Sequence, residues 1–120
     1  MAVTTDYQPD NICVLHVGGT LKRSELAAGQ EEMAQKIDAG AEPRLLAILE
    51  DDFEGWERGA DWNDLDFLFS YSDKIARIAI VANPRWEVDT LGFAGAGVRR
   101  APVKFFRPNE LEQARAWLAA

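Results

Sequence analysis

Two nearly unbroken apolar runs limit the folds that are open to this chain. Residues 44–50 read Arg-Leu-Leu-Ala-Ile-Leu-Glu, and residues 75–82 read Ile-Ala-Arg-Ile-Ala-Ile-Val-Ala. Runs of this length are too short to span a membrane and are typical of strands that are buried on both faces of a sheet. Helices must then cover both faces of a parallel sheet, so these runs predict an α/β domain.

Further strands are predicted on either side of these two. Residues 3–7 and 12–18 are rich in β-forming side chains, and Gln8-Pro9-Asp10-Asn11 between them favours a turn, so we expect an N-terminal hairpin. A last strand is predicted at residues 102–106. Because helices are expected between the later strands, those strands should pair in parallel, with the hairpin adding one antiparallel member.

About four helices are predicted. The first is expected at residues 24–38, with Ser24 as its N-terminal cap and Gly40 as its stop. The second covers residues 59–71, and the third begins at Asn83-Pro84. The fourth opens with a capping box at residues 109–112. The predicted order is ββαβαβαβα, a single domain over residues 1–120 with a mixed, mostly parallel sheet of about five strands.

Length, cysteine count and charge exclude several classes of protein. The chain has 120 residues, 48% of them hydrophobic, and neither a run of about 18 apolar residues nor a signal peptide at its start. One cysteine excludes an internal disulfide and a multi-cysteine zinc site, and it suits the cytoplasm. The net charge is −7 and no nucleic-acid-binding motif is present, so no nucleic-acid partner is expected.

Charge is distributed unevenly along the chain. Residues 50–66 carry eight carboxylates against one arginine, whereas residues 74–107 carry seven basic residues against two acidic ones. The basic half is interpreted as a solvated surface, with contact to an anionic headgroup or an acidic partner surface as the alternative.

No catalytic residue is predicted. Cys13 and His16 both lie in the second expected strand, where we interpret them as a buried thiol and a hydrogen-bonded sheet histidine. No Gly-x-Ser-x-Gly motif occurs, so hydrolytic triad chemistry has no support. The protein is therefore expected not to be an enzyme and to use no cofactor. Catalysis by carboxylates of residues 50–66 is kept as a third alternative.

The acidic stretch at residues 50–66 also matches part of a calcium-binding loop. Glu50, Asp52, Glu54, Gly55 and Asp61 fall at positions 1, 3, 5, 6 and 12 of that pattern. The two end residues are of the wrong length, and a strand precedes the loop where a helix should. No metal site is therefore predicted.

The expected second helix carries more aromatic side chains than one buried face needs. A step of about 100° per residue places its core face around Trp62, and leaves Phe67 and Tyr71 together on nearly the opposite side. Either a neighbouring helix covers these two rings, or they form a lid, a dimer contact or an edge that touches a membrane.

A set of short motifs, in this order along the chain, points to a known family. They are Gly19-Thr20-Leu21, Ser24-Glu25-Leu26, Phe53-Glu54-Gly55-Trp56, Trp62 with Asp64-Leu65, residues 77–81, Trp86-Glu87, Phe105-Phe106 and residues 110–118. Over nearly its whole length the chain resembles the SpoIIAA-like proteins, a bacterial family grouped with STAS domains and lipid-carrying CRAL-TRIO domains. The resemblance implies a small STAS-like domain of sheet and helices that binds lipophilic ligands or approaches membranes.

The chain departs from the wider STAS pattern in one respect. Within that wider pattern, anti-sigma-factor antagonists carry a phosphorylatable serine near the start of the helix that follows the central strand. Residues 50–69 contain no serine, threonine or tyrosine. A phosphorylation switch is therefore chemically excluded at this site, and Gly55 and Trp56 occupy the equivalent space.

The function predicted from the sequence is non-enzymatic binding of a lipophilic small molecule or a membrane surface. In open parallel sheets, ligands bind beyond the carboxyl ends of the strands, which here means the loops after Glu50 and Ala82. An apolar cleft is expected there, between the second and third helices. Its predicted ligand-binding residues are Trp56, Trp62, Phe67, Tyr71 and Trp86, with Arg85 to meet an anionic headgroup.

The alternative is a protein-interaction module that docks a protein partner or a second copy of the chain. The acidic segment and the Phe67/Tyr71 patch would form that contact, and a homodimer would be one form of it. A cytoplasmic location is expected in either case, peripheral to the membrane if a lipid surface is the ligand.

Overall fold

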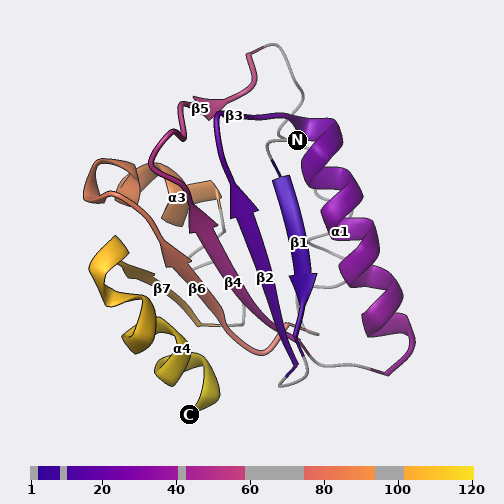
Figure 1. The fold of residues 1–120 in the computed structure, drawn as a ribbon. Coiled ribbons are helices and arrows are strands. Elements are labelled where there is room, and N and C mark those ends of the chain that lie inside the picture. Colours follow the sequence, from indigo (N-terminus) through magenta and orange to yellow (C-terminus); the bar gives the residue numbers. More distant parts are fainter. Residues whose placement is uncertain (1–2, 9–10, 41–42, 59–74, 94–101) are drawn as a thin grey trace.

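Five strands form the main sheet, in the order β1-β2-β4-β6-β7 (Figure 1). The structure is a computed structural model that describes residues 3–8, 11–40, 43–58, 75–93 and 102–120. The strands are β1 (Val3–Tyr7), β2 (Ile12–Val17), β4 (Arg44–Leu49), β6 (Ile78–Val81) and β7 (Val103–Phe106). β1 runs antiparallel to β2, and each later neighbour is parallel. This arrangement confirms the predicted mixed sheet with an N-terminal antiparallel hairpin.

The described residues contain three α-helices, fewer than the four predicted. They are α1 (Arg23–Asp38), α3 (Glu87–Phe93) and α4 (Leu111–Ala119). Short 3₁₀ turns, η2 (Pro84–Trp86) and η3 (Pro108–Glu110), lead into α3 and α4. The helix predicted over residues 59–71 lies outside the described residues.

The first helix starts earlier than predicted, and Ser24 is not its cap. The carbonyl of Lys22 accepts hydrogen bonds from the backbone N–H groups of Glu25 and Leu26, at 3.1 and 3.0 Å, and the side chain of Lys22, the N-cap residue, makes no capping hydrogen bond. Lys22 has an extended backbone, because a short strand ends at the residue before it. The predicted stop is correct: Gly40 has a φ of 103° and donates to the carbonyl of Ile37.

The predicted start of the third helix is correct, and that of the fourth helix is wrong. The side chain of Asn83 accepts a hydrogen bond from the backbone N–H of Arg85 at 3.0 Å, as expected for the cap of the third helix. The capping box predicted at Asn109 is displaced towards the N-terminus. Glu110 accepts from the backbone N–H of Arg107 at 2.9 Å, because the chain enters α4 through η3.

Alternate residues of the strands pack on opposite faces of the sheet. One face packs against α4, and its buried residues are Ile12, Val14, Leu46, Ala79, Val81, Phe106, Ala114 and Leu118. The other packs against α1 and α3, and its buried residues are Cys13, Met33, Ile37, Ile75, Ile78, Ile80 and Ala82. Figure 1 shows α1 beside β1 and α4 beside β6 and β7. Helices on both faces explain why the central strands are apolar throughout.

A second, smaller sheet was not predicted. β3 (Thr20–Leu21) pairs in parallel with β5 (Gly55–Trp56). Both strands lie beyond the carboxyl ends of β2 and β4 (Figure 1). The short pair therefore joins the two loops that leave these neighbouring strands.

Candidate functional site

The parallel strands bring the predicted loops to one edge of the sheet. His16 pairs with Ile48 and Ile48 with Val81, so β2, β4 and β6 end side by side. The segments that follow these strands therefore meet at the carboxyl edge of the sheet, where open α/β folds bind their ligands.

The described part of the acidic stretch, residues 50–58, lies at this edge and is tied along its length to residues 17–21. From here on we call residues 50–58 the acidic segment. The backbone N–H groups of Glu50, Glu54 and Glu57 donate to the carbonyls of Val17, Gly19 and Leu21, each at 2.8 Å. These three bonds and the β3–β5 pairing give the segment a defined backbone.

Side chains reinforce the same connection. The Asp52 carboxylate accepts from the backbone N–H of Gly19 at 3.4 Å, and a Cβ added to Gly18 would lie 2.9 Å from that carboxylate. The Glu57 carboxylate accepts from the backbone N–H of Arg23 at 3.2 Å, at the start of α1. Because Asp51, Asp52 and Glu54 are exposed, the segment presents negative charge on a fixed scaffold.

Three aromatic rings form a cluster beside the acidic segment. Phe53 is 2% exposed, and its ring centroid lies 5.4 Å from that of Trp56 and 4.8 Å from that of Trp86. The two indole centroids are 6.0 Å apart, and all three pairs meet edge to face. We call Phe53, Trp56 and Trp86 the edge cluster. Its phenyl ring belongs to the core, whereas both indoles are partly exposed.

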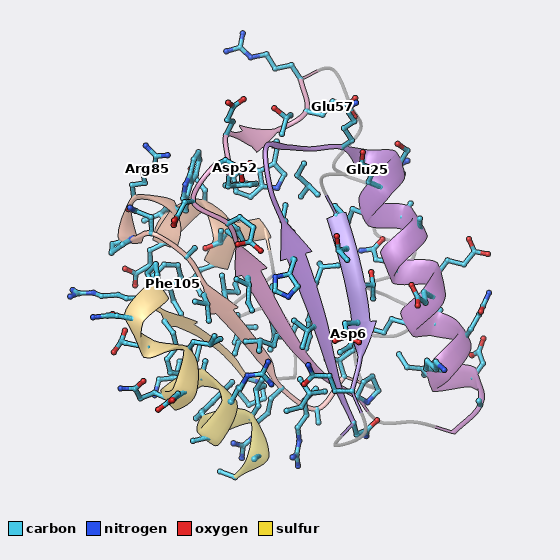
Figure 2. All side chains as sticks on the ribbon, viewed as in Figure 1. Asp6, Glu25, Asp52, Glu57, Arg85 and Phe105 are labelled. Carbon is cyan, nitrogen blue, oxygen red and sulfur yellow. The ribbon has the colours of Figure 1, made fainter. Side chains whose placement is uncertain are left out.

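Arg85 extends the edge cluster into solvent. Its guanidinium carbon lies 5.0 Å from the centroid of the Trp86 ring, a cation–π distance, and the residue is exposed. Figure 2 shows Arg85, Asp52 and Glu57 at the same end of the molecule, the end where β3 and β5 lie. This end therefore combines carboxylates, two indoles and an exposed guanidinium that lies over one of them.

Half of the predicted site residues can be placed. Trp56, Arg85 and Trp86 come together at the carboxyl edge, as the loop positions required. Trp62, Phe67 and Tyr71 lie outside the described residues, so the cleft expected between the second and third helices stays a prediction.

Sequence reasoning missed two residues that organise this edge, Phe53 and Gly55. Phe53 stands among four acidic residues directly after a buried strand, and that contrast was a usable signal for a buried anchor. Gly55 has a φ of 116°, and a Cβ there would lie 3.7 Å from Cη2 of Trp86. Its backbone thus packs beside the Trp86 indole in a conformation that favours glycine.

The titratable groups at and near this edge include a histidine–carboxylate pair and a buried thiol. His16 Nδ1 lies 2.8 Å from the carboxylate of Glu50, with side chains 41% and 48% exposed, which confirms the predicted hydrogen-bonded sheet histidine. Burial raises the pKa of the Cys13 thiol to about 11, with smaller contributions from Glu32 and Asp6. A thiol of this kind is a poor nucleophile at neutral pH.

The remaining sequence expectations concern metals and membranes. Among the residues that the structure describes, no three His, Cys, Asp or Glu side chains are grouped so as to hold a metal ion. Asp61, the last position of the partial calcium pattern, lies outside them. Within the same residues, no helix has the length and apolar composition needed to cross a bilayer.

Comparisons with known proteins agree on the fold. An uncharacterised protein of the DUF3478 family from Shewanella loihica PV-4, with a SpoIIAA-like fold, superposes with a TM-score of 0.68 at 19% identity, over 98% of this chain and 92% of that one. The anti-sigma factor antagonist SpoIIAA in its unphosphorylated form superposes with a TM-score of 0.60 at 12% identity, over 97% and 98% of the two chains. None of the curated proteins matches the chain.

The family comparison extends this likeness from fold to sequence. The SpoIIAA-like family model matches residues 12–119, from the start of β2 to the end of α4. The match includes the acidic segment, the edge cluster and Arg85. The chain belongs to the SpoIIAA-like family.

Proposed function

We propose that this protein is a non-catalytic docking domain that binds a protein partner through the carboxyl edge of its sheet. One observation carries the proposal: the acidic segment is exposed, yet its backbone is tied to residues 17–21 by three hydrogen bonds of 2.8 Å. A surface that is already ordered loses less conformational entropy when it binds.

The side chains at this edge suit a protein interface. Tryptophan is enriched among residues that contribute most to binding energy, and Trp56 and Trp86 are partly exposed next to the exposed carboxylates. The carboxylates would steer and orient a partner of opposite charge. A protein partner also fits the description of SpoIIAA, a protein of similar fold, as an anti-sigma factor antagonist.

Charge reversal within the acidic segment tests this proposal. The double variant Asp51→Lys/Glu54→Lys changes two exposed residues of the segment, and Glu31→Lys/Glu32→Lys makes the same charge change at exposed positions of α1. Each immobilised protein is incubated with an extract of the source organism, and retained proteins are identified by mass spectrometry. We expect a partner that the wild type and the α1 variant retain, that the edge variant loses, and that high salt releases.

The purified partner should then act on the proposed surface. Adding it to the ¹⁵N-labelled protein is expected to shift the amide signals of residues 50–58 and 83–89 most. Equal retention by all three proteins, or shifts confined to α1 and α4, would refute the docking edge.

A second candidate function is binding of an amphipathic small molecule or a lipid surface. It is supported by the two partly exposed indoles beside an exposed guanidinium, a combination of apolar area and positive charge. Trp62, Phe67 and Tyr71 would complete this site. Titration with a fatty acid and with phosphatidylglycerol vesicles is then expected to change tryptophan fluorescence, and Trp56→Ala to reduce the change. Unchanged fluorescence and no co-sedimentation with vesicles would exclude it.

Self-association is a further form of docking that the sequence suggests. Sedimentation velocity at several protein concentrations measures it. A dimer that Phe67→Ser and Tyr71→Ser abolish without a salt dependence would use the aromatic patch, whereas a salt-sensitive dimer would use the acidic segment.

A further inference from the structure

The Trp86 ring already holds a cation on one side. The Arg85 guanidinium carbon lies 5.0 Å from its centroid, and Arg85 is exposed, so this is the solvent side of the ring. The indole also meets the rings of Phe53 and Trp56 and packs against two clusters of buried core residues. The outer face of Trp86 is thus the part of the edge cluster that a partner would meet.

The surroundings of this face favour positive charge. Phe53, Gly55 and Trp56 belong to the acidic segment, in which Asp51, Asp52 and Glu54 are exposed. Glu87 and Asp89 of α3, which follow Trp86 in the sequence, are also exposed. A cation placed on the indole therefore gains both from the ring and from the negative potential of these carboxylates.

Arg85 is held weakly in its place. Within the part of the chain that the structure describes, its side chain makes no ion pair, and its guanidinium lies over the Trp86 ring. An exposed cation–π contact is a weak interaction. A guanidinium held in this way can be exchanged for one from another molecule.

We propose that the outer face of Trp86 is a binding site for an arginine or lysine side chain of a basic protein partner, and that Arg85 occupies this site in the free protein. The proposal rests on the proposed function and names the chemistry of its partner. Binding then replaces an internal cation by an external one, so Arg85 lowers the affinity for a partner whose cation must displace it.

A hexa-arginine peptide serves as the probe, titrated into the protein by calorimetry at low salt. The test variant is Arg85→Gln, and the matched control is Arg58→Gln, which removes the same charge from an exposed residue of the acidic segment that stacks on none of the described rings. We expect Arg85→Gln to bind the peptide about two- to fivefold more tightly than Arg58→Gln does, the range given by loss of an exposed cation–π contact. The indole N–H signal of Trp86 should shift further on peptide addition in Arg85→Gln than in wild type.

The outcomes separate this proposal from the proposed function. Equal affinities of Arg85→Gln and Arg58→Gln would overturn it, because charge alone would then explain the effect. If Asp51→Lys/Glu54→Lys abolishes peptide binding in that case, the docking edge stands without a cation site. If the edge reversal leaves binding unchanged while Arg85→Gln gains affinity and shifts Trp86, the cation site stands without the docking edge. Absence of peptide binding in every protein would overturn both.

Discussion

Two arginine–tryptophan stacks of nearly equal geometry serve different purposes in this molecule. The guanidinium carbon of Arg85 lies 5.0 Å from the Trp86 ring, and that of Arg77 lies 5.2 Å from the Trp117 ring. Arg77 is half-buried and also donates from Nη1 to the backbone carbonyl of Trp117. Arg85 is exposed and has no such anchor in the described residues. A cation–π distance alone therefore does not show whether the contact stabilises the fold or can be exchanged. The additional hydrogen bond of Arg77 to the Trp117 carbonyl makes that distinction.

The charge around the two stacks differs as well. The Trp117 ring lies 6.1 Å from that of Phe106, over which the amine of Lys104 lies at 5.3 Å. We call Phe106 and Trp117 the helix cluster. It carries basic side chains and attaches α4 to the sheet, whereas the edge cluster takes Phe53 and Trp56 from the acidic segment and Trp86 from η2. The two aromatic clusters therefore lie next to side chains of opposite charge.

Truncation of the buried ring in the edge cluster should have the largest effect. Phe53→Ala is expected to lower the free energy of unfolding by about 3–5 kcal/mol, because the ring is buried and supports both indoles. Urea denaturation followed by circular dichroism measures the loss, and the tryptophan emission should shift to longer wavelength. Phe106→Ala, its counterpart in the helix cluster, should cost a similar amount. A loss below about 1 kcal/mol for Phe53→Ala would show that the edge cluster is not part of the core.

A smaller loss is expected at the glycine beside Trp86. Gly55→Ala should cost about 1–3 kcal/mol, because a φ of 116° is strained for any residue with a Cβ. The new methyl group would only touch the indole, at 3.7 Å, so the cost lies in the backbone. Gly40→Ala, which has a φ of 103° but no atom within 4 Å, is the matched control for strain without that contact. Unchanged stability in Gly55→Ala would mean that the acidic segment can relax away from its ties.

The comparison of the two stacks can be tested directly. Arg77→Gln is expected to cost about 1–2 kcal/mol, because it removes a half-buried hydrogen bond as well as the ring contact. Arg85→Gln is expected to cost about 0.5 kcal/mol or less, because its contact is exposed. Thermal unfolding of the two variants in one buffer gives the difference. Equal losses would contradict the division into a fixed and an exchangeable stack.

The smallest effect is expected on the outer surface of α3. Val88 is 83% exposed, so Val88→Ser should change the free energy of unfolding by less than about 0.5 kcal/mol. Chemical denaturation of wild type and variant side by side checks this. A larger loss would mean that Val88 is covered in solution, for instance by a second copy of the chain.

The sheet was predictable because its signals are local. The strand in the apolar run at residues 44–50, the antiparallel pairing of β1 with β2 and the stop at Gly40 each follow from neighbouring residues, and each is where it was expected. Helix caps were less predictable. At the start of α1 the backbone carbonyl of Lys22, in place of the hydroxyl of Ser24, accepts from N–H groups of the first turn.

The site was predictable only in its location. The parallel topology placed Trp56, Arg85 and Trp86 at one edge, because the alternation of strands and helices makes the later strands parallel and brings their carboxyl ends to the same side. The stacking of Arg85 on its own neighbour, and the burial of Phe53 between two indoles, depend on the β3–β5 pairing. That pairing joins segments far apart in the sequence, neither of which has a strand-like pattern of its own.

The β3–β5 pair also has a consequence for the order in which the chain folds. Thr20 cannot meet Gly55 until β2 and β4 have paired, because closing a loop of this length costs entropy that two short strands do not recover alone. The acidic edge should therefore be ordered late in folding and open first in the native state. Native-state amide hydrogen exchange should show it, with Glu57, whose N–H is bonded to Leu21, exchanging faster than Leu46 in the centre of the sheet. If this surface folds last, a bound partner can stabilise it without altering the rest of the domain.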